Sequence, residues 1–139
     1  MARMEFSGTD ELMAQLYAET EKLEKRATEM LEAAGEYAAG EWRTAIERAQ
    51  HAPPGKSGRA TGDLMASVRA SKPRKKGDRY ETSIYPQGKD RHGQRMADIA
   101  FSLHYGTSRI RGDHFVDDAE ENIGQNVFEI MADVWEKSE

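Results

Sequence analysis

The sequence contains no cysteine, so disulfide bonds and thiolate zinc sites are excluded and a reducing compartment is the natural setting. It also has no apolar run close to the roughly 18 residues that cross a bilayer. Residues 1–5 lack the apolar stretch of a signal peptide. We therefore expect a soluble protein that is made in the cytoplasm and has no membrane partner.

Hydrophobic side chains are also few. They make up 37% of the 139 residues, whereas charged residues make up 32%. A chain of this length is expected to form one domain, 1–139, with a modest core. The apolar residues concentrate toward the two ends, so the middle of the chain is expected to depend on neighbouring elements, or on other subunits, for its order.

Positive charge is scarce at both ends and abundant in the middle. Residues 1–52 carry 6 basic and 11 acidic side chains, residues 53–95 carry 11 and 4, and residues 96–139 carry 3 and 10. The three net charges are −5, +7 and −7, which sum to the −5 of the whole chain. Three interpretations are open: neutralisation within one fold, head-to-tail pairing between copies, or contact with DNA.

The first segment predicts one long helix over 9–50, because its apolar residues recur mostly in steps of three, four or seven. Ser7 or Thr9 is its expected N-cap. Gly35 and Gly40 predict either a bend or the close approach of another element. The prolines and glycines after residue 52 are expected to end the helix and to leave a mobile loop over 51–60.

The remainder predicts a β-hairpin over 67–86, whose strands are joined by a basic connector at 72–78, and then a polar loop over 87–94. Residues 95–105 predict a short helix, with a strand as the alternative. The last helix is expected over 113–137, capped by Asp113. The predicted fold class is α+β: a long N-terminal helix, a hairpin or small antiparallel sheet, a short helix and a C-terminal helix.

Several short stretches imitate functional motifs, but their context does not support them. Gly55-Lys56-Ser57 resembles the end of a phosphate-binding loop without the glycine and the strand that should precede it. His104 and His114, with nearby aspartates at 113, 117 and 118, suggest a divalent metal, yet isolated surface positions are the expected arrangement. We predict no catalytic residues, no cofactor and no metal.

A basic cluster in the hairpin is the strongest candidate for binding through charge. It comprises Lys72, Arg74, Lys75, Lys76 and Arg79. Such a cluster can grip phosphates in a salt-sensitive way, although aromatic side chains for stacking are limited to Tyr80 and Tyr85. A small nucleic-acid-binding module using 72–79 is therefore the alternative function, and a solvated loop or a protein–protein contact is favoured over it.

Three short stretches, in their order along the chain, resemble one protein family. The first box consists of Thr61, Gly62, Leu64, Ser67 and Val68, the second box of Tyr105, Gly106 and Thr107, and the third box of Phe115 and Ala119. The resemblance spans about residues 10–137 and is to the small tail-completion, or head–tail joining, proteins of long-tailed double-stranded DNA phages and prophages. His104 stands where these proteins usually have glutamate, and Asp118 where a proline is usual.

The resemblance implies a structural, non-enzymatic protein of the virion neck, assembled in the cytoplasm of a bacterial host. Its expected partners are further copies of itself in a ring, the phage connector or neck proteins, and tail terminator or tail tube proteins. Contact with DNA is not predicted. On this interpretation the three boxes are architectural, and the loops 51–60 and 86–95 settle against neighbours in the ring.

Overall fold

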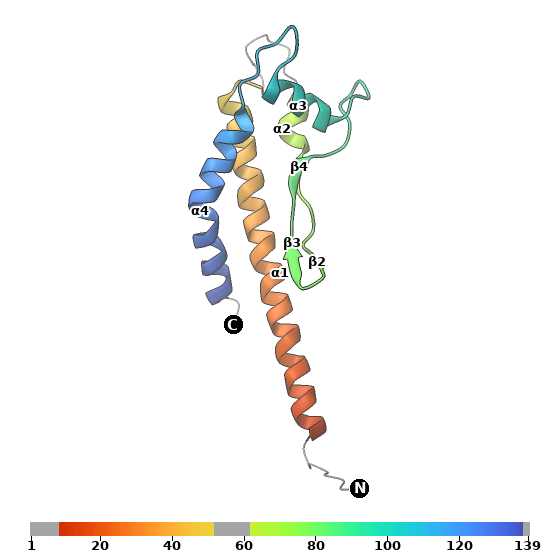
Figure 1. Ribbon diagram of the computed structural model, residues 1–139, viewed down its shortest axis with the longest axis vertical. Helices are drawn as coiled ribbons and strands as arrows, with labels where there is room; N and C mark the ends of the chain where they lie inside the picture. Colours follow the sequence, from red (N-terminus) through yellow and green to blue (C-terminus); the bar gives the residue numbers. More distant parts are fainter. Residues whose placement is uncertain (1–8, 52–61, 138–139) are drawn as a thin grey trace.

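The computed structural model describes residues 9–51 and 62–137, and it has the α+β architecture expected from the sequence (Figure 1). Its helices are α1 (Thr9–Arg48), α2 (Asp63–Ser67), α3 (Met96–Tyr105) and α4 (Phe115–Lys137). Its strands are β1 (Val68–Ala70), β2 (Arg74–Lys76), β3 (Arg79–Glu81) and β4 (Ile84–Pro86). Several features expected from the sequence lie outside the described part: the side chains of Ser7 and Thr9, residues 52–60 of the expected loop with its Gly55-Lys56-Ser57 stretch, and Thr61.

Helix α1 runs along the whole molecule, with α4 on one side and the strands on the other (Figure 1). Its C-terminus closes with a left-handed residue, Gln50, at φ 64°. The N–H of His51 then donates to the carbonyl of Ile46 (2.9 Å), and the N–H of Gln50 donates to that of Glu47 (3.0 Å). This pair of bonds is a Schellman motif. The helix therefore ends ahead of the prolines that were expected to stop it.

The strands form one long antiparallel hairpin that is interrupted by a bulge. β1 pairs with β4 and β2 pairs with β3, and the turn is the two-residue loop Gly77-Asp78. The prediction of a basic connector over 72–78 is wrong, because Arg74–Lys76 is itself a paired strand. Gly77 has φ +66°, which suits the first position of such a tight turn.

The bulge lies at Lys72 and Pro73, which together face the single residue Thr82. Proline has no N–H to give to the ladder, and the Thr82 hydroxyl supplies a bond instead by donating to the Ser71 carbonyl (2.6 Å). An extra residue in one strand reverses its alternation of faces. As a result Ala70 contacts α1 before the bulge and Lys75 contacts it after the bulge.

The segment between β4 and α3 is held by its own hydrogen bonds. The carboxylate of Asp90 accepts from the N–H groups of His92 (2.9 Å) and Gln94 (2.8 Å). Arg91 makes a two-bond contact with Asp63 of α2, at 3.0 and 2.9 Å. These bonds tie the predicted 87–94 loop to the body of the subunit, while its settling against neighbours in a ring stays a prediction.

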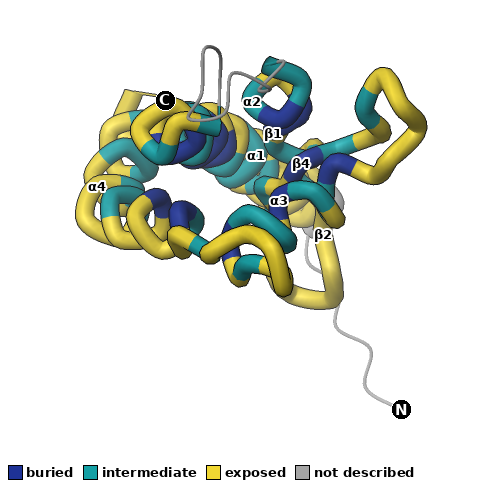
Figure 2. The backbone as a smooth tube through the Cα atoms, turned by 90° about the horizontal axis from the view of Figure 1, so that it is seen from above, coloured by how far each residue is buried: buried dark blue, intermediate teal, exposed yellow. Residues whose placement is uncertain are grey.

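Residues 96–105 of the predicted 95–105 form a helix rather than the alternative strand, and Gly106 closes it. The main core lies where α1, α2, β1, α3 and α4 meet, and Figure 2 shows buried stretches on the sides of these elements that face one another. Its largest fully buried side chains are Ile46, Val68 and Phe115. No helix in the described ranges, 9–51 and 62–137, combines the length and apolar character that crossing a membrane requires.

Candidate functional site

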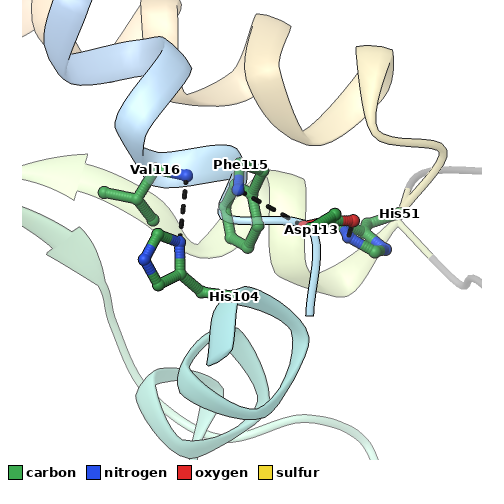
Figure 3. Close-up of polar contacts among 5 residues, drawn as sticks. All are labelled: His51, His104, Asp113, Phe115 and Val116. Atoms are coloured by element: carbon green, nitrogen blue, oxygen red, sulfur yellow. Dashed lines mark hydrogen bonds and ion pairs between the residues drawn. The ribbon is translucent and has the colours of Figure 1, made fainter. Parts of the chain in front are cut away.

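Three segments far apart in the sequence converge on Phe115, the first residue of α4 (Figure 3). Its ring is 1% exposed and makes edge contacts with Trp42 of α1 (6.4 Å between centroids), with His51 (5.4 Å) and with His104 of α3 (5.9 Å). We call this group of residues, together with Asp113, the Phe115 junction. It fixes the ends of α1 and α3 against the beginning of α4.

His104 is buried, which corrects the prediction of an isolated surface position. Its Nδ1 accepts a hydrogen bond from the backbone N–H of Val116 (3.3 Å), and its carbonyl accepts one from the N–H of His114 (3.0 Å). The first N–H groups of a helix have no partner within the helix. The imidazole supplies one, so His104 acts as a cap for α4 that comes from another helix.

Asp113 provides the second cap of α4, as the sequence predicts. One of its carboxylate oxygens accepts from the N–H of Phe115 (3.3 Å), and the other accepts from Nε2 of His51 (2.6 Å). The His51 side chain lies just beyond the Schellman end of α1. One aspartate therefore joins the C-terminus of α1 to the N-terminus of α4, as Figure 3 shows.

The structure brings together three of the five residues that suggested a metal site. One possible ligand atom from each of His104, His114 and Asp117 lies within 4.8 Å of the others. However, Nδ1 of His104 is occupied as an acceptor, so the proton of the neutral ring sits on Nε2, the atom that is 3.8 Å from Asp117. A histidine that binds a metal through one ring nitrogen usually donates an N–H from the other ring nitrogen to a neighbour, whereas Nδ1 of His104 accepts. The geometry fits helix capping better than metal binding.

The second box folds into a crossing of two backbone segments. A Cβ on Gly106 would lie 2.6 Å from the backbone N of Gly112, and a Cβ on Gly112 would lie 2.3 Å from the carbonyl carbon of Tyr105. Thr107 closes the intervening turn, because its hydroxyl accepts from the N–H groups of Arg109 (3.2 Å) and Ile110 (3.1 Å). Gly112 is as tightly enclosed as Gly106.

The described members of the first box support the same core as the third box. Gly62 precedes α2 with φ 85°, a conformation that glycine adopts without steric cost. The Ser67 hydroxyl donates to the Leu64 carbonyl (2.6 Å) and so satisfies a buried polar group. The buried hydrophobic residues of the two boxes belong to one cluster: Leu64, Val68, Phe115 and Ala119. The boxes thus meet in space around the Phe115 junction.

The basic cluster of the hairpin is partly neutralised within the subunit. Arg74 pairs with Glu81 across the two strands (3.1 Å), and Lys75 pairs with Glu24 of α1 (3.3 Å). Hydrogen bonds from Tyr80 and Lys75 lower the pKa of Glu24 below its ordinary value. Within the described residues, Lys72, Lys76 and Arg79 have no ion pair, and all three are exposed. These three side chains are the ones available to a partner.

The two faces of the subunit that flank α1 carry opposite charge. The hairpin, 68–86, has six basic residues, counting Arg69, against two acidic ones, Asp78 and Glu81. α4 has one basic residue, Lys137, against seven acidic ones, all exposed: Asp117, Asp118, Glu120, Glu121, Glu129, Asp133 and Glu136. Figures 1 and 2 place the hairpin and α4 on different sides of α1. The positive charge of the hairpin and the negative charge of α4 are therefore separated in space, whereas part of the hairpin's charge is neutralised by Glu24 of α1.

Comparison of the chain with models of protein families, with characterised proteins and with solved structures finds no match.

Proposed function

We propose that this chain is a structural protein of the head–tail junction of a long-tailed phage, which acts by assembling with copies of itself and by docking to neck and tail proteins. The observation that carries the proposal is the separation of the acidic α4 from the basic hairpin across α1. Opposite faces that complement each other favour head-to-tail contacts, and such contacts form a ring when the rotation between neighbours closes.

The residues that carry the family resemblance support an architectural role. Gly106 turns the chain where its backbone crosses Gly112, Ser67 satisfies a buried carbonyl, and Phe115 anchors the junction of three segments. Each of these contacts positions α1, the hairpin or α4, which are the elements that carry the charged faces. In the proposed assembly, the unpaired Lys72, Lys76 and Arg79 of one copy face the acidic outer surface of α4 on the next.

The proposal places the protein in the virion neck, after assembly in the cytoplasm of the host, where it contacts the connector on one side and the tail terminator or tail tube on the other. No catalytic step is part of it. Electrostatic contacts of this kind give specificity and set the salt dependence of association more than they give raw affinity.

The proposal is tested by deleting the gene in the phage or prophage that encodes the chain. We expect filled heads and finished tails that fail to join, visible by electron microscopy, and rescue by the wild-type protein supplied in trans. A variant that reverses three exposed hairpin charges, K72E/K76E/R79E, should fold but should not rescue. Normal virions from the deletion strain would refute the proposal.

A further inference from the structure

The first third of α1 has no partner within the described subunit. Every residue over 11–23 is exposed, and the first contacts with other elements are those of Glu24 with the hairpin and of Arg26 with Trp135 of α4. Figure 1 shows this part of α1 extending beyond both the hairpin and the end of α4. At 1.5 Å per residue, residues 9–23 give about 22 Å of isolated helix.

This isolated part is apolar on one side. Leu12 is 55% exposed, Leu16 54% and Leu23 49%, and Met13 and Tyr17 lie beside them. The three leucines follow each other by four and seven residues, and the same spacing continues to the buried alanines at 34 and 38. A helix face that is buried in one half therefore continues, uncovered, into the other half. We call residues 12, 16 and 23 the leucine stripe.

The covered half of this face shows which kind of element fits it. α4 runs antiparallel to α1, since Arg26 contacts Trp135, Tyr37 contacts Asn122 and Trp42 contacts Phe115. It ends at Lys137, two residues after Trp135, and the contact of Trp135 with Arg26 lies three residues from Leu23 of the stripe. An antiparallel helix placed on the stripe would continue the line of α4 along α1.

We infer that the leucine stripe binds the same stripe of a second copy of this chain, in antiparallel orientation. Charge selects the orientation. The isolated part of α1 begins with the acidic Glu11 and ends near the basic Lys25, and both side chains are exposed. Lys22 and Lys25 also pair along their own helix, with Glu19 (3.4 Å) and Glu29 (4.0 Å). An antiparallel pair sets Glu11 of one copy near Lys25 of the other, whereas a parallel pair sets like charges opposite each other.

The position of the rest of each subunit, which we call its body and which begins at residue 24, selects the same orientation. In the antiparallel pair, Leu12 of each copy packs on Leu23 of the other, and the two Leu16 side chains meet between these layers. Each body begins at residue 24, so the bodies lie at opposite ends of the paired helices. The inference goes beyond the proposed function, since it requires neither a phage nor the charged faces.

Orientation is tested by disulfide trapping, for which the absence of cysteine is an advantage. An equimolar mixture of Leu12→Cys and Leu23→Cys full-length chains should give a disulfide-linked heterodimer under mild oxidation. Leu12→Cys alone should not crosslink, because 11 residues of helix separate the two sulfurs by about 16 Å. Crosslinking of Leu12→Cys with itself, without the mixed product, would overturn the antiparallel pair.

Affinity is tested by sedimentation velocity at about 0.5 M salt, which suppresses association through surface charge. We expect a monomer–dimer equilibrium whose dissociation constant rises at least about tenfold in Leu16→Lys. The matched control is Phe128→Lys, which changes the most exposed aromatic residue of α4 (76%) and should leave the equilibrium unchanged. A monomer at every concentration, or an equal effect of the two variants, would overturn the inference. A variant that still dimerises but no longer supports head–tail joining would bear on the proposed function and not on this inference.

Discussion

Gly35 of α1 lies so close to Ala70 of β1 that a Cβ built on the glycine would be 2.8 Å from the Cβ of the alanine. The close approach of another element, one of the two arrangements the sequence allows at Gly35, is therefore the one found there. Gly40, five residues further along α1, has open space where its Cβ would be. The two glycines form a natural pair of test positions within one helix.

We predict opposite effects of alanine at these two positions. Gly35→Ala should destabilise the protein by about 1–3 kcal/mol, because Ala70 and the hairpin must move away from α1. Gly40→Ala should stabilise it by up to about 1 kcal/mol through helix propensity. Urea unfolding followed by circular dichroism measures both. Equal effects at the two positions would contradict the packing of the hairpin on α1.

Gly112→Ala should be at least as damaging as Gly35→Ala. The added Cβ would meet backbone atoms of Tyr105 and His104 at 2.3 and 2.5 Å, and backbone cannot move aside as a flexible side chain does. The control is Gly124→Ala in α4, where the space is open. We expect a large fall in melting temperature for the first variant and no fall for the second. A Gly112→Ala protein of wild-type stability would show that the two segments do not cross as described.

His104→Ala should cost about 1–3 kcal/mol from the unsatisfied N–H of Val116, in addition to the loss of packing against Phe115. His104→Asn keeps a hydrogen-bond acceptor near the position of Nδ1 and should recover part of that loss. Thermal unfolding of the three proteins measures the difference. Equal stability of the two variants would contradict the capping role.

The same cluster predicts no response to metal. Addition of Zn²⁺ or Ni²⁺, or removal of metal with a chelator, should leave the melting temperature of the wild-type protein unchanged, since His104 uses Nδ1 as an acceptor. A metal-dependent rise that His114→Ala abolishes would reverse this assignment.

Glu24 should make the docking of the hairpin sensitive to acid. Its pKa is lowered from 4.5 by hydrogen bonds from Tyr80 and Lys75, so the folded state binds a proton less readily than the unfolded state does. The resulting stabilisation is present above the unfolded pKa and is lost as the pH falls through the lower, folded pKa. Wild type should therefore melt above Glu24→Gln at pH 7, and the two melting temperatures should converge as the pH falls well below 4.5. A difference that persists at acid pH would point to packing rather than charge.

Duplex DNA should not bind the basic hairpin at about 50 mM salt, because Arg74 and Lys75 already pair with carboxylates of the subunit. A gel-shift titration at that salt measures this directly. A salt-dependent shift that is lost in K72A/K76A/R79A would instead favour the nucleic-acid-binding alternative.

The sequence alone predicts the three long helices and, in the hairpin, the arm that contains β3 and β4. The alternation of Tyr80, Thr82 and Ile84 with the residues between them predicts a strand, and the structure adds that these three residues lie toward α1. In the other arm, β1 lies within the predicted hairpin, whereas β2 was missed because Arg74–Lys76 is uniformly charged and exposed and so has no apolar alternation. It becomes a strand only through the tight turn and the pairing with β3.

The Phe115 junction was only partly predictable. His104 follows the buried Met96 and Ala100 in steps of four, so helical spacing alone places it on the buried face of α3. Its use as a cap for α4 and the crossing of Gly106 with Gly112 depend on contacts between separate segments. The residue pattern within one segment contains no signal for contacts between separate segments.

Assembly through opposite charges is tested most directly with two reversed chains. K72E/K76E/R79E makes the hairpin acidic like α4, and E129K/D133K/E136K removes the net negative charge of α4 while the hairpin stays basic. The Arg74–Glu81 and Lys75–Glu24 pairs stay intact in both chains. Sedimentation velocity at low salt is the measurement, with Leu16→Lys in every chain to remove the stripe contact. We expect assemblies from chains with wild-type faces, none from either reversed chain alone, and assemblies again from an equimolar mixture of the two. Reversed chains that assemble alone, or a mixture that stays monomeric when wild-type faces assemble, would contradict assembly through opposite charges.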